Sequence, residues 1–201
     1  MVMGATLSNS YYNGEVPFFP IVDNSVTDGD IRRLWSCNSS QGDRYIQITD
    51  QVVPAETGQC FVVAATGETE GLTMPLTDIK FNQTQPIPQM FKLSFQKNDT
   101  WYTAQAADTS ALLTASSELV LTDEDTSDTS FQVIHLLSPN RPYIVLRSNK
   151  KQGEEHLYLS SDGAGNLRLK VWNKPIPLPP RTTAEVDPAL LFRLVRPLGQ
   201  N

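Results

Sequence analysis

The chain is poor in charged residues and contains no long hydrophobic run. Only 19% of its 201 residues are charged, and the formal net charge is −6. Proteins that bind nucleic acid need a basic surface, so this balance argues against a nucleic-acid partner. No segment approaches the length of apolar sequence that crosses a bilayer, so we expect no membrane span.

Cysteine and histidine are also scarce, with two of each. Cys37 and Cys60 both lie in apolar runs typical of strands, where a free thiol behaves as a small hydrophobe. Two buried thiols or one disulfide between them both fit this pattern. The four residues lack the spacing of metal ligands, so we expect no metal and no cofactor.

The N-terminal residues lack the basic segment and the apolar run of a secretory signal. The expected location is therefore the cytoplasm, or the outside of the cell after release by a leaderless route.

Turn-forming residues and alternating hydrophobicity dominate what is present. In the stretch 156–172, Leu157 and Leu159 alternate with polar residues, and Leu167 and Leu169 resume the alternation after a glycine-containing turn. A period of two around such a turn predicts a β-hairpin with one buried face.

The same alternation recurs along the chain, and no helical apolar stripe exceeds about two turns. The sequence therefore predicts an all-β domain over 31–201, preceded by an extended N-terminal arm over 1–30 whose aromatic residues favour docking on the domain. A single helical turn is expected at 188–190. Besides the 156–172 hairpin, the expected strands lie at 31–37, 45–48, 60–63, 76–81, 90–95, 101–104, 112–114, 119–121, 131–136, 143–146 and 191–195.

Three of these segments share a short pattern of phenylalanine, a long polar residue and a branched aliphatic residue. They begin at Phe91, Phe131 and Phe192. An aromatic-led strand follows the first two, and segment 31–48 supplies two similar opening strands. The pattern predicts three internal repeats, each of about four short strands.

This threefold repeat resembles the β-trefoil superfamily over residues 31–197. The resemblance implies six strands closed into a barrel and six more that form three capping hairpins, with pseudo-threefold symmetry. A β-sandwich or another barrel with accidental spacing is the alternative.

Among trefoils, the chain lacks the Q-x-W motif of ricin-type lectins. It is similar in size and low charge to small leaderless fungal trefoils, which include lectins and cysteine-protease inhibitors. A weaker likeness to interleukin-one-like cytokines rests on segments 33–35, 45–46 and 50–53.

Catalytic constellations are missing from the sequence. Nucleophilic catalysis usually needs a positioned base, and only His135 and His156 are available. His135 is in phase with Phe131 and Val133, so we expect it in or just below the core, whereas we expect His156 to be solvated. No phosphate-binding or dinucleotide-binding glycine motif is present. The protein is therefore expected not to be an enzyme.

Two places combine aromatic and amide or carboxylate side chains in the way that a sugar site requires. Aromatic faces stack on apolar sugar faces, while amides and carboxylates bond paired hydroxyls. The alternative at each place is a turn residue beside a core or rim aromatic. The first place has Asp99, Trp101 and Tyr102 after Asn98, and the second has Asp162, Asn166, Trp172 and Asn173.

A proline-rich segment after Trp172 offers a different kind of surface. Its prolines predict a stiff, extended loop that suits a protease cleft or an adaptor groove, although it is also compatible with a plain rigid surface loop. The residues that would make these contacts are Lys174, Pro175, Ile176, Pro177, Leu178 and Arg181. The expected function is thus a non-catalytic, carbohydrate-binding lectin, with a protein-binding trefoil (protease inhibitor or cytokine-like ligand) as the alternative.

Overall fold

The structure is a computed structural model of the chain. It describes residues 21–37, 44–55, 58–65, 77–106, 116–123, 128–136, 143–161, 167–174 and 186–197, with the backbone alone for 44–55, 58–65 and 116–118.

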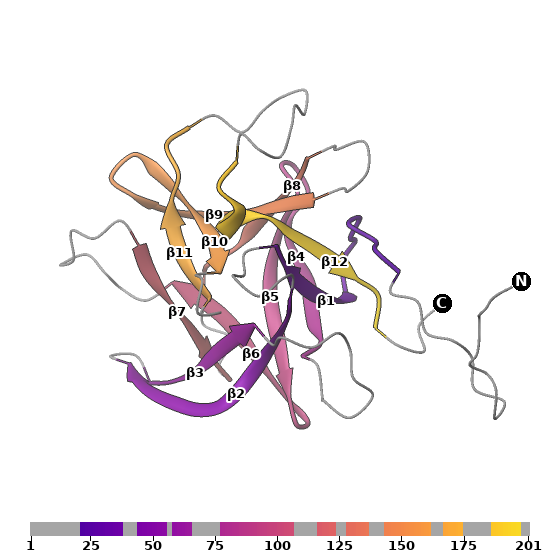
Figure 1. Cartoon of the computed structure of the whole chain (residues 1–201), viewed down its shortest axis with the longest axis vertical. Helices are drawn as coiled ribbons and strands as arrows, with labels where there is room; N and C mark the ends of the chain where they lie inside the picture. Colours follow the sequence, from indigo (N-terminus) through magenta and orange to yellow (C-terminus); the bar gives the residue numbers. More distant parts are fainter. Residues whose placement is uncertain are drawn as a thin grey trace, which may run out of the picture.

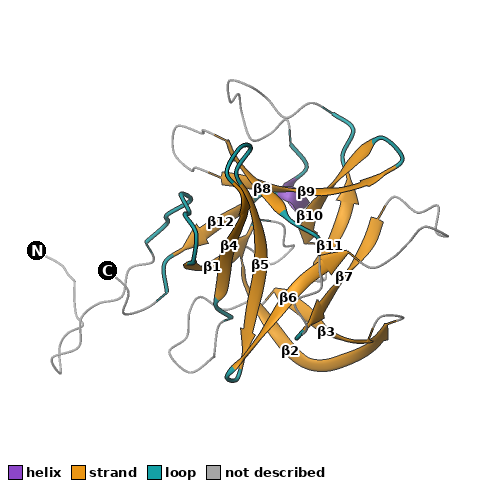
Figure 2. Cartoon of the chain, turned by 180° about the vertical axis from the view of Figure 1, so that it is seen from behind, coloured by secondary structure: helices purple, strands orange, loops and turns teal. Residues whose placement is uncertain are grey.

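Most of the described residues lie in β-strands, which confirms the predicted all-β class (Figure 2). One turn of 3-10 helix, η2 (Pro188–Leu190), occurs where the single helical turn was expected. The strands are β1 (Asp30–Ser36), β2 (Arg44–Ala55), β3 (Gly58–Ala65), β4 (Ile79–Gln85), β5 (Met90–Lys97), β6 (Thr100–Ala106), β7 (Ser116–Thr122), β8 (Phe131–Leu136), β9 (Tyr143–Gln152), β10 (Glu155–Ser161), β11 (Leu167–Val171) and β12 (Phe192–Val195).

Six of the strands form a closed ring. In order around the ring, β1 pairs with β4, β4 with β5, β5 with β8, β8 with β9, β9 with β12, and β12 with β1, all antiparallel. The other six strands form the antiparallel pairs β2–β3, β6–β7 and β10–β11, and β11 also pairs with β7 (Figure 1). Because every ring strand has a neighbour on both sides, none of the six presents an unpaired edge.

The main hydrophobic core is rich in phenylalanine. Phe81 and Phe91 meet edge to face, with ring centroids 5.7 Å apart and planes inclined by 82°. Full burial of a side chain of this size stabilises the fold by about 1.5–3 kcal/mol. The largest fully buried side chains of this core are Phe81, Phe91, Phe95, Phe131, Phe192, Leu34, Ile79, Leu93, Leu121, Ile144 and Leu146.

The strand positions expected from alternation agree with the structure wherever it is described. The 156–172 stretch contains most of β10 and all of β11, and the expected strand at 76–81 overlaps the start of β4. The expected strand at 112–114 lies outside the described residues. Local alternation therefore located strands correctly without any knowledge of their partners.

The described part of the N-terminal arm contacts the domain through backbone pairing. Val22 forms a β-bridge with Val195, and the backbone N–H of Asp23 donates to the carbonyl of Leu194 at 2.8 Å. Gly29, with φ of 86°, completes the turn into β1. This conformation is strained for residues with a Cβ, so glycine suits it. Residues 1–20 of the arm lie outside the described residues.

A second, smaller apolar cluster lies on the other face of β8, β9 and β10. Its buried members are Leu136, Tyr143, Val145, Tyr158, Val186, Leu190 and Leu191. At its margin the buried Arg193 guanidinium lies 4.5 Å from the ring centroid of Trp35 and 4.4 Å from that of Tyr143. Arg193 Nη2 also donates to Tyr143 Oη at 2.8 Å. An aromatic sandwich of this kind stabilises a buried cation.

Cys37 lies beside this cluster as a free, half-buried thiol, so the alternative of a disulfide with Cys60 is not realised. Its Sγ is 3.7 Å from Tyr143 Oη.

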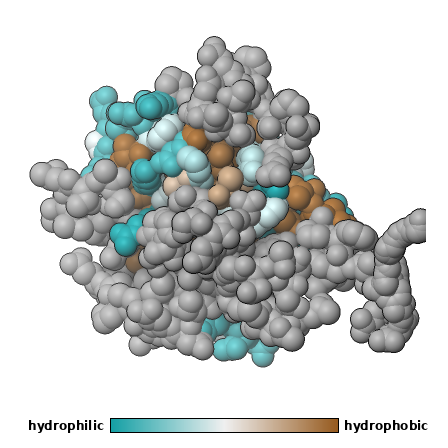
Figure 3. Space-filling model, in the orientation of Figure 1, coloured by the Kyte–Doolittle hydropathy of each residue, from teal (hydrophilic) through white to brown (hydrophobic). Residues whose placement is uncertain are grey.

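Exposed large hydrophobic residues are few in the described part of the chain: Ile21, Val22 and Ile87. On the face shown in Figure 3, described apolar side chains are interrupted by hydrophilic ones. None of the described helical residues forms a segment long and apolar enough to cross a bilayer.

Candidate functional site

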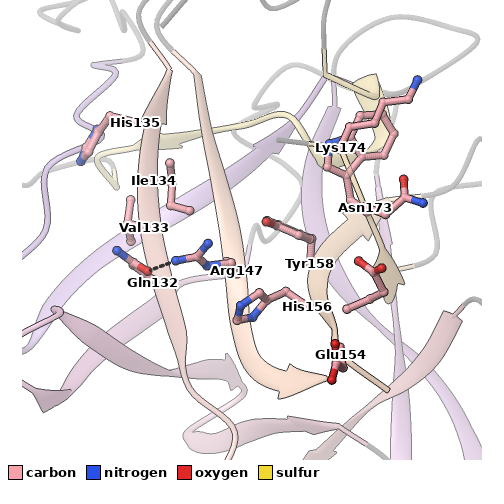
Figure 4. A pocket seen from close by; sticks show the side chains of 12 residues that line it. Gln132, Val133, Ile134, His135, Arg147, Glu154, His156, Tyr158, Asn173 and Lys174 are labelled. Atoms are coloured by element: carbon pink, nitrogen blue, oxygen red, sulfur yellow. Dashed lines mark hydrogen bonds between the residues drawn. The ribbon is translucent and has the colours of Figure 1, made fainter. Parts of the chain in front are cut away.

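A groove with a volume of about 590 Å³ lies where β8, β9 and β10 run beside the residues that follow β11 (Figure 4). Its wall is mixed, with aromatic, charged and amide side chains. The lining residues are Gln132, Val133, Ile134, His135, Arg147, Glu154, Glu155, His156, Tyr158, Trp172, Asn173 and Lys174.

Strand register places three polar side chains in a row across the groove. Gln132 of β8 lies opposite Arg147 of β9, and Arg147 lies opposite Tyr158 of β10. Residues directly opposite each other in antiparallel strands share a face of the sheet. Arg147 Nη2 donates to Gln132 Oε1 at 2.8 Å, which holds the guanidinium in the middle of the row (Figure 4).

A register shift brings His156 to the same groove. Between His156 and Tyr158 the β9–β10 pairing is irregular, so that His156 pairs with Lys151 while Tyr158 pairs with Arg147. Irregularities of this kind re-aim a side chain and are common beside binding sites.

His156 is half-buried, and its surroundings disfavour the protonated form of the imidazole. Burial is the main cause that lowers its pKa, and the positive charge of Arg147 lowers the pKa further, whereas a hydrogen bond with the Ser148 backbone raises it. The net shift is downward, so His156 is a neutral imidazole at pH 7 with one donor and one acceptor nitrogen.

The inner end of the groove rests on the second apolar cluster. Tyr158 belongs to this cluster and is buried, while Ile134 and Trp172 pack against it from its edge. Because these side chains are fixed by packing, the aromatic wall is rigid before any ligand binds.

Two groove nitrogens have no hydrogen-bond partner within the described part of the chain. They are His156 Nδ1 and Trp172 Nε1, and both are buried. A buried polar atom without a partner typically costs about 1–3 kcal/mol. Such atoms are therefore infrequent in folded proteins, and two in one groove point to a place where polar ligand atoms are received.

The first predicted sugar site is an exposed hairpin rather than a cavity wall. Asp99 lies at the tip of the β5–β6 turn, where Asn98 has a φ of 55°, and its side chain is exposed. Trp101 and Tyr102 are consecutive strand residues, so their rings point to opposite faces. Tyr102 packs on the main core, and the Lys80 ammonium lies 4.4 Å from the ring centroid of Trp101. One face of Trp101 is thus covered by a cation.

The second predicted sugar site is partly assembled in the groove. Trp172 and Asn173 both line it, and so does Lys174, the first residue of the predicted protein-binding loop. Lys174 Nζ lies 5.4 Å from the centroid of the Trp172 ring. The other predicted residues of these two sites lie outside the described residues: Asp162, Asn166, Pro175, Ile176, Pro177, Leu178 and Arg181.

Both histidine predictions need correction. His135 is exposed, not in or just below the core, because exposure rises along the inner face of β8 from Phe131 through Val133 to the strand end. Partial burial by its neighbours still lowers its pKa. His156 is half-buried instead of solvated, because the register shift in β10 turns it into the groove.

The sequence analysis missed Gln132, Arg147 and Tyr158 as groove residues. Each lies in a strand that was correctly expected, but no motif links them, since they meet only through strand pairing. The one available signal was Arg147, a charged residue that directly follows the apolar run 143–146.

Within the described residues, no group of three or more His, Cys, Asp or Glu side chains is arranged to hold a metal ion. The chain matches no protein-family model, and a search of curated proteins finds no significant relative.

Proposed function

We propose that the chain is a β-trefoil. The closed ring of six strands supports this proposal, because each of the pairs β2–β3, β6–β7 and β10–β11 lies in sequence between two ring strands. The proposed units are 30–85, 90–136 and 143–195. Each pairs its first ring strand with its last at a matched position: Arg32 opposite Ile79, Phe91 opposite Phe131, and Ile144 opposite Phe192.

This assignment changes the repeat inferred from sequence. Phe131 and Phe192 correspond to each other and to Ile79, whereas Phe91 corresponds to Ile144. The three-phenylalanine alignment therefore assigns Phe91 to the wrong strand of its unit. Phe91 and Phe131 are instead cross-strand partners within one unit.

We propose further that the protein is a carbohydrate-binding lectin and that the groove is its binding site. The observation that carries this proposal is the half-buried Trp172, packed against the cluster that holds the buried Tyr158, beside converging polar groups. Two of these groups are nitrogens without a hydrogen-bond partner in the described part of the chain. Aromatic side chains of this kind present an apolar body that packs on a sugar ring. The Gln132 and Asn173 amides each offer both donors and acceptors for hydroxyl groups.

The proposed role is binding without catalysis. No serine, threonine or cysteine lines the groove among the described residues, so a nucleophile next to His156 is missing there. Catalytic carboxylic acids are commonly tuned by burial. Both groove glutamates, Glu154 and Glu155, are exposed.

A glycan array with matched variants tests the lectin proposal. Trp172→Ala should weaken binding by about 2 kcal/mol or more, the usual loss at an aromatic hot spot. Asn173→Ala, at an exposed position, should weaken it without affecting folding. Trp101→Ala serves as the control and should leave affinity unchanged. Thermal melting of each variant separates loss of binding from loss of fold. A blank array, or full binding by both Trp172→Ala and Asn173→Ala, would refute the proposal.

Protein binding remains the second candidate because of one feature, the tip of the β4–β5 hairpin. Ile87 is 89% exposed there and is flanked by Pro86 and Pro88. An apolar side chain on a proline-restricted turn is pre-ordered for insertion into a partner. Ile87→Asp can be added to the same set of variants. If the protein-binding function is correct, this substitution should abolish binding of the protein partner. If the lectin function is correct, it should leave glycan binding intact.

A further inference from the structure

We propose that the sugar bound in the groove carries a carboxylate, and that Arg147 binds this carboxylate; the inference rests on the proposed lectin function. The observation that carries it is a half-buried guanidinium in the groove whose only side-chain hydrogen bond within the described residues is to a neutral amide.

Arg147 has unused hydrogen-bonding capacity. A guanidinium has five N–H donors, and with the residues that the structure describes Arg147 makes a single side-chain hydrogen bond, to Gln132 Oε1 at 2.8 Å. It forms no ion pair with any residue in the described part of the chain. The other arginine cations that are similarly enclosed have a carboxylate or aromatic partners: Arg32 and Arg33 pair with aspartates, and Arg193 lies between two rings.

Its neighbours hold Arg147 in a fixed orientation. The cross-strand bond to Gln132 fixes one edge of the planar guanidinium, and Tyr158, opposite Arg147 on β10, is buried and rigid. A pre-oriented guanidinium fork matches the two oxygens of a carboxylate and binds them through parallel hydrogen bonds. A neutral hydroxyl group uses only one of these donors.

The surrounding charges are compatible with an anion at this position. Lys174 contributes a second cation at the groove, held near the Trp172 ring. His156 is neutral because burial and the charge of Arg147 lower its pKa. It therefore neither repels the Arg147 cation nor competes with it for the carboxylate. Glu154 and Glu155 oppose an anion, but both are exposed near the β9–β10 turn, where solvent and salt screen their charge.

The ligand is thus a pyranose that stacks on the aromatic wall and directs its carboxylate to Arg147. Hexuronic acids and sialic acids share this chemistry. Methyl glucuronide and methyl glucoside form a matched pair of probes, since they differ only in the carboxylate at C6. The methyl glycoside of N-acetylneuraminic acid distinguishes the second source of the carboxylate.

Isothermal titration of the full chain with these probes tests the inference. The better acidic sugar should bind at least about tenfold more tightly than methyl glucoside, as expected for hydrogen bonds to a charged group. Arg147→Met should remove this difference while it retains the weaker binding common to both sugars. Arg147→Lys keeps the charge without the fork and should recover only part of the preference.

Lys151→Met is the matched control, because it removes one positive charge from an exposed position on the same strand outside the groove. It should preserve the preference within about twofold, as expected for a screened surface charge. A preference that survives Arg147→Met, in a variant whose melting is normal, refutes the role of Arg147.

Equal binding of the acidic and neutral sugars refutes the anionic ligand but leaves the lectin proposal intact. Absence of binding by every sugar at millimolar concentration refutes both. Competition by acetate as strong as that by the acidic sugar would refute the sugar as ligand, since a carboxylate alone would then suffice.

Discussion

Within the described part of the arm, the carboxylate of Asp23 is expected to make the largest electrostatic contribution to the free energy of unfolding. Its Oδ2 accepts hydrogen bonds from Arg196 Nη2 at 2.7 Å, from Arg196 Nε at 2.9 Å and from Arg32 Nη2 at 3.1 Å. Its Oδ1 accepts one from the backbone N–H of Ser25 at 3.2 Å. One carboxylate therefore joins the arm, β1 and the residue after β12.

The perturbation is Asp23→Asn, and its cost follows from the burial of each partner. The Arg32 side chain is only 8% exposed, so the substitution removes the nearer carboxylate from a nearly buried cation. Arg32 keeps hydrogen bonds to the Asp23, Ser25 and Ile31 carbonyls and an ion pair with Asp30 at 3.6 Å. A hydrogen bond to a charged group contributes about 1.5–3 kcal/mol. Arg196 is 36% exposed, and an exposed pair contributes about 0–1 kcal/mol. We expect a total loss of about 2–3 kcal/mol at pH 7.

The effect should depend on pH with a defined sign. Burial by itself would raise the pKa of Asp23, but the hydrogen bond from Arg196 and the charge of Arg32 outweigh it and hold the pKa below its usual value. A lowered folded-state pKa means that the stabilisation is complete above the unfolded-state pKa of about 3.9 and is lost as the pH falls through the folded-state value.

Urea denaturation at a series of pH values measures this effect. The wild-type midpoint should exceed that of Asp23→Asn at pH 7 without a change in slope, and the two should converge as the pH falls through the lowered folded-state pKa of Asp23. Asp123→Asn, which removes an exposed carboxylate from the end of β7, is the control and should change little. Equal effects of the two substitutions, or a gap that persists in acid, would refute this account of the arm.

Two further predictions concern the Tyr143 hydroxyl and the two histidines. Tyr143→Phe keeps the ring under Arg193 but removes the 2.8 Å hydrogen bond, so thermal and chemical unfolding should show a loss of about 1.5–3 kcal/mol; an unchanged midpoint would show that the hydroxyl does not stabilise the cation. Burial lowers the pKa of both histidines, so the free energy of unfolding should fall as the pH drops through about 6.5 and should level off below their folded-state pKa values. His156→Gln should remove part of this decline, and His135→Gln should remove another part. An undiminished decline in the double variant would assign the decline to other groups.

The positions of the strands were predictable because strand formation in this chain is encoded locally. Leu157 and Leu159 in β10, and Leu167 and Leu169 in β11, are buried as their alternation indicated. Side chains of a strand point alternately to opposite faces, so this pattern can be read without knowledge of partners. The all-β class followed from the same alternation, and the single helical turn expected at 188–190 is also present. The aromatic residues on which the expected docking of the arm rested lie outside the described residues.

The groove was predictable only in part. The sequence singled out Trp172, Asn173 and Lys174, but the groove residues on β8, β9 and β10 meet only through long-range pairing. Gln132 and Arg147 become neighbours when β8 pairs with β9, and His156 joins them through an irregularity that no local pattern encodes. His135 shows a related limit. Its alternation with Phe131 and Val133 was interpreted correctly, but the sequence does not indicate where along β8 the core ends. Alternation determines which face a side chain takes, whereas the closure of β1 on β12 and the register between strands decide which faces meet. The sequence by itself thus determined the strands of this protein. Its tertiary structure alone decided where Arg147, which has no ion pair within the described residues, lies beside Gln132 and Tyr158.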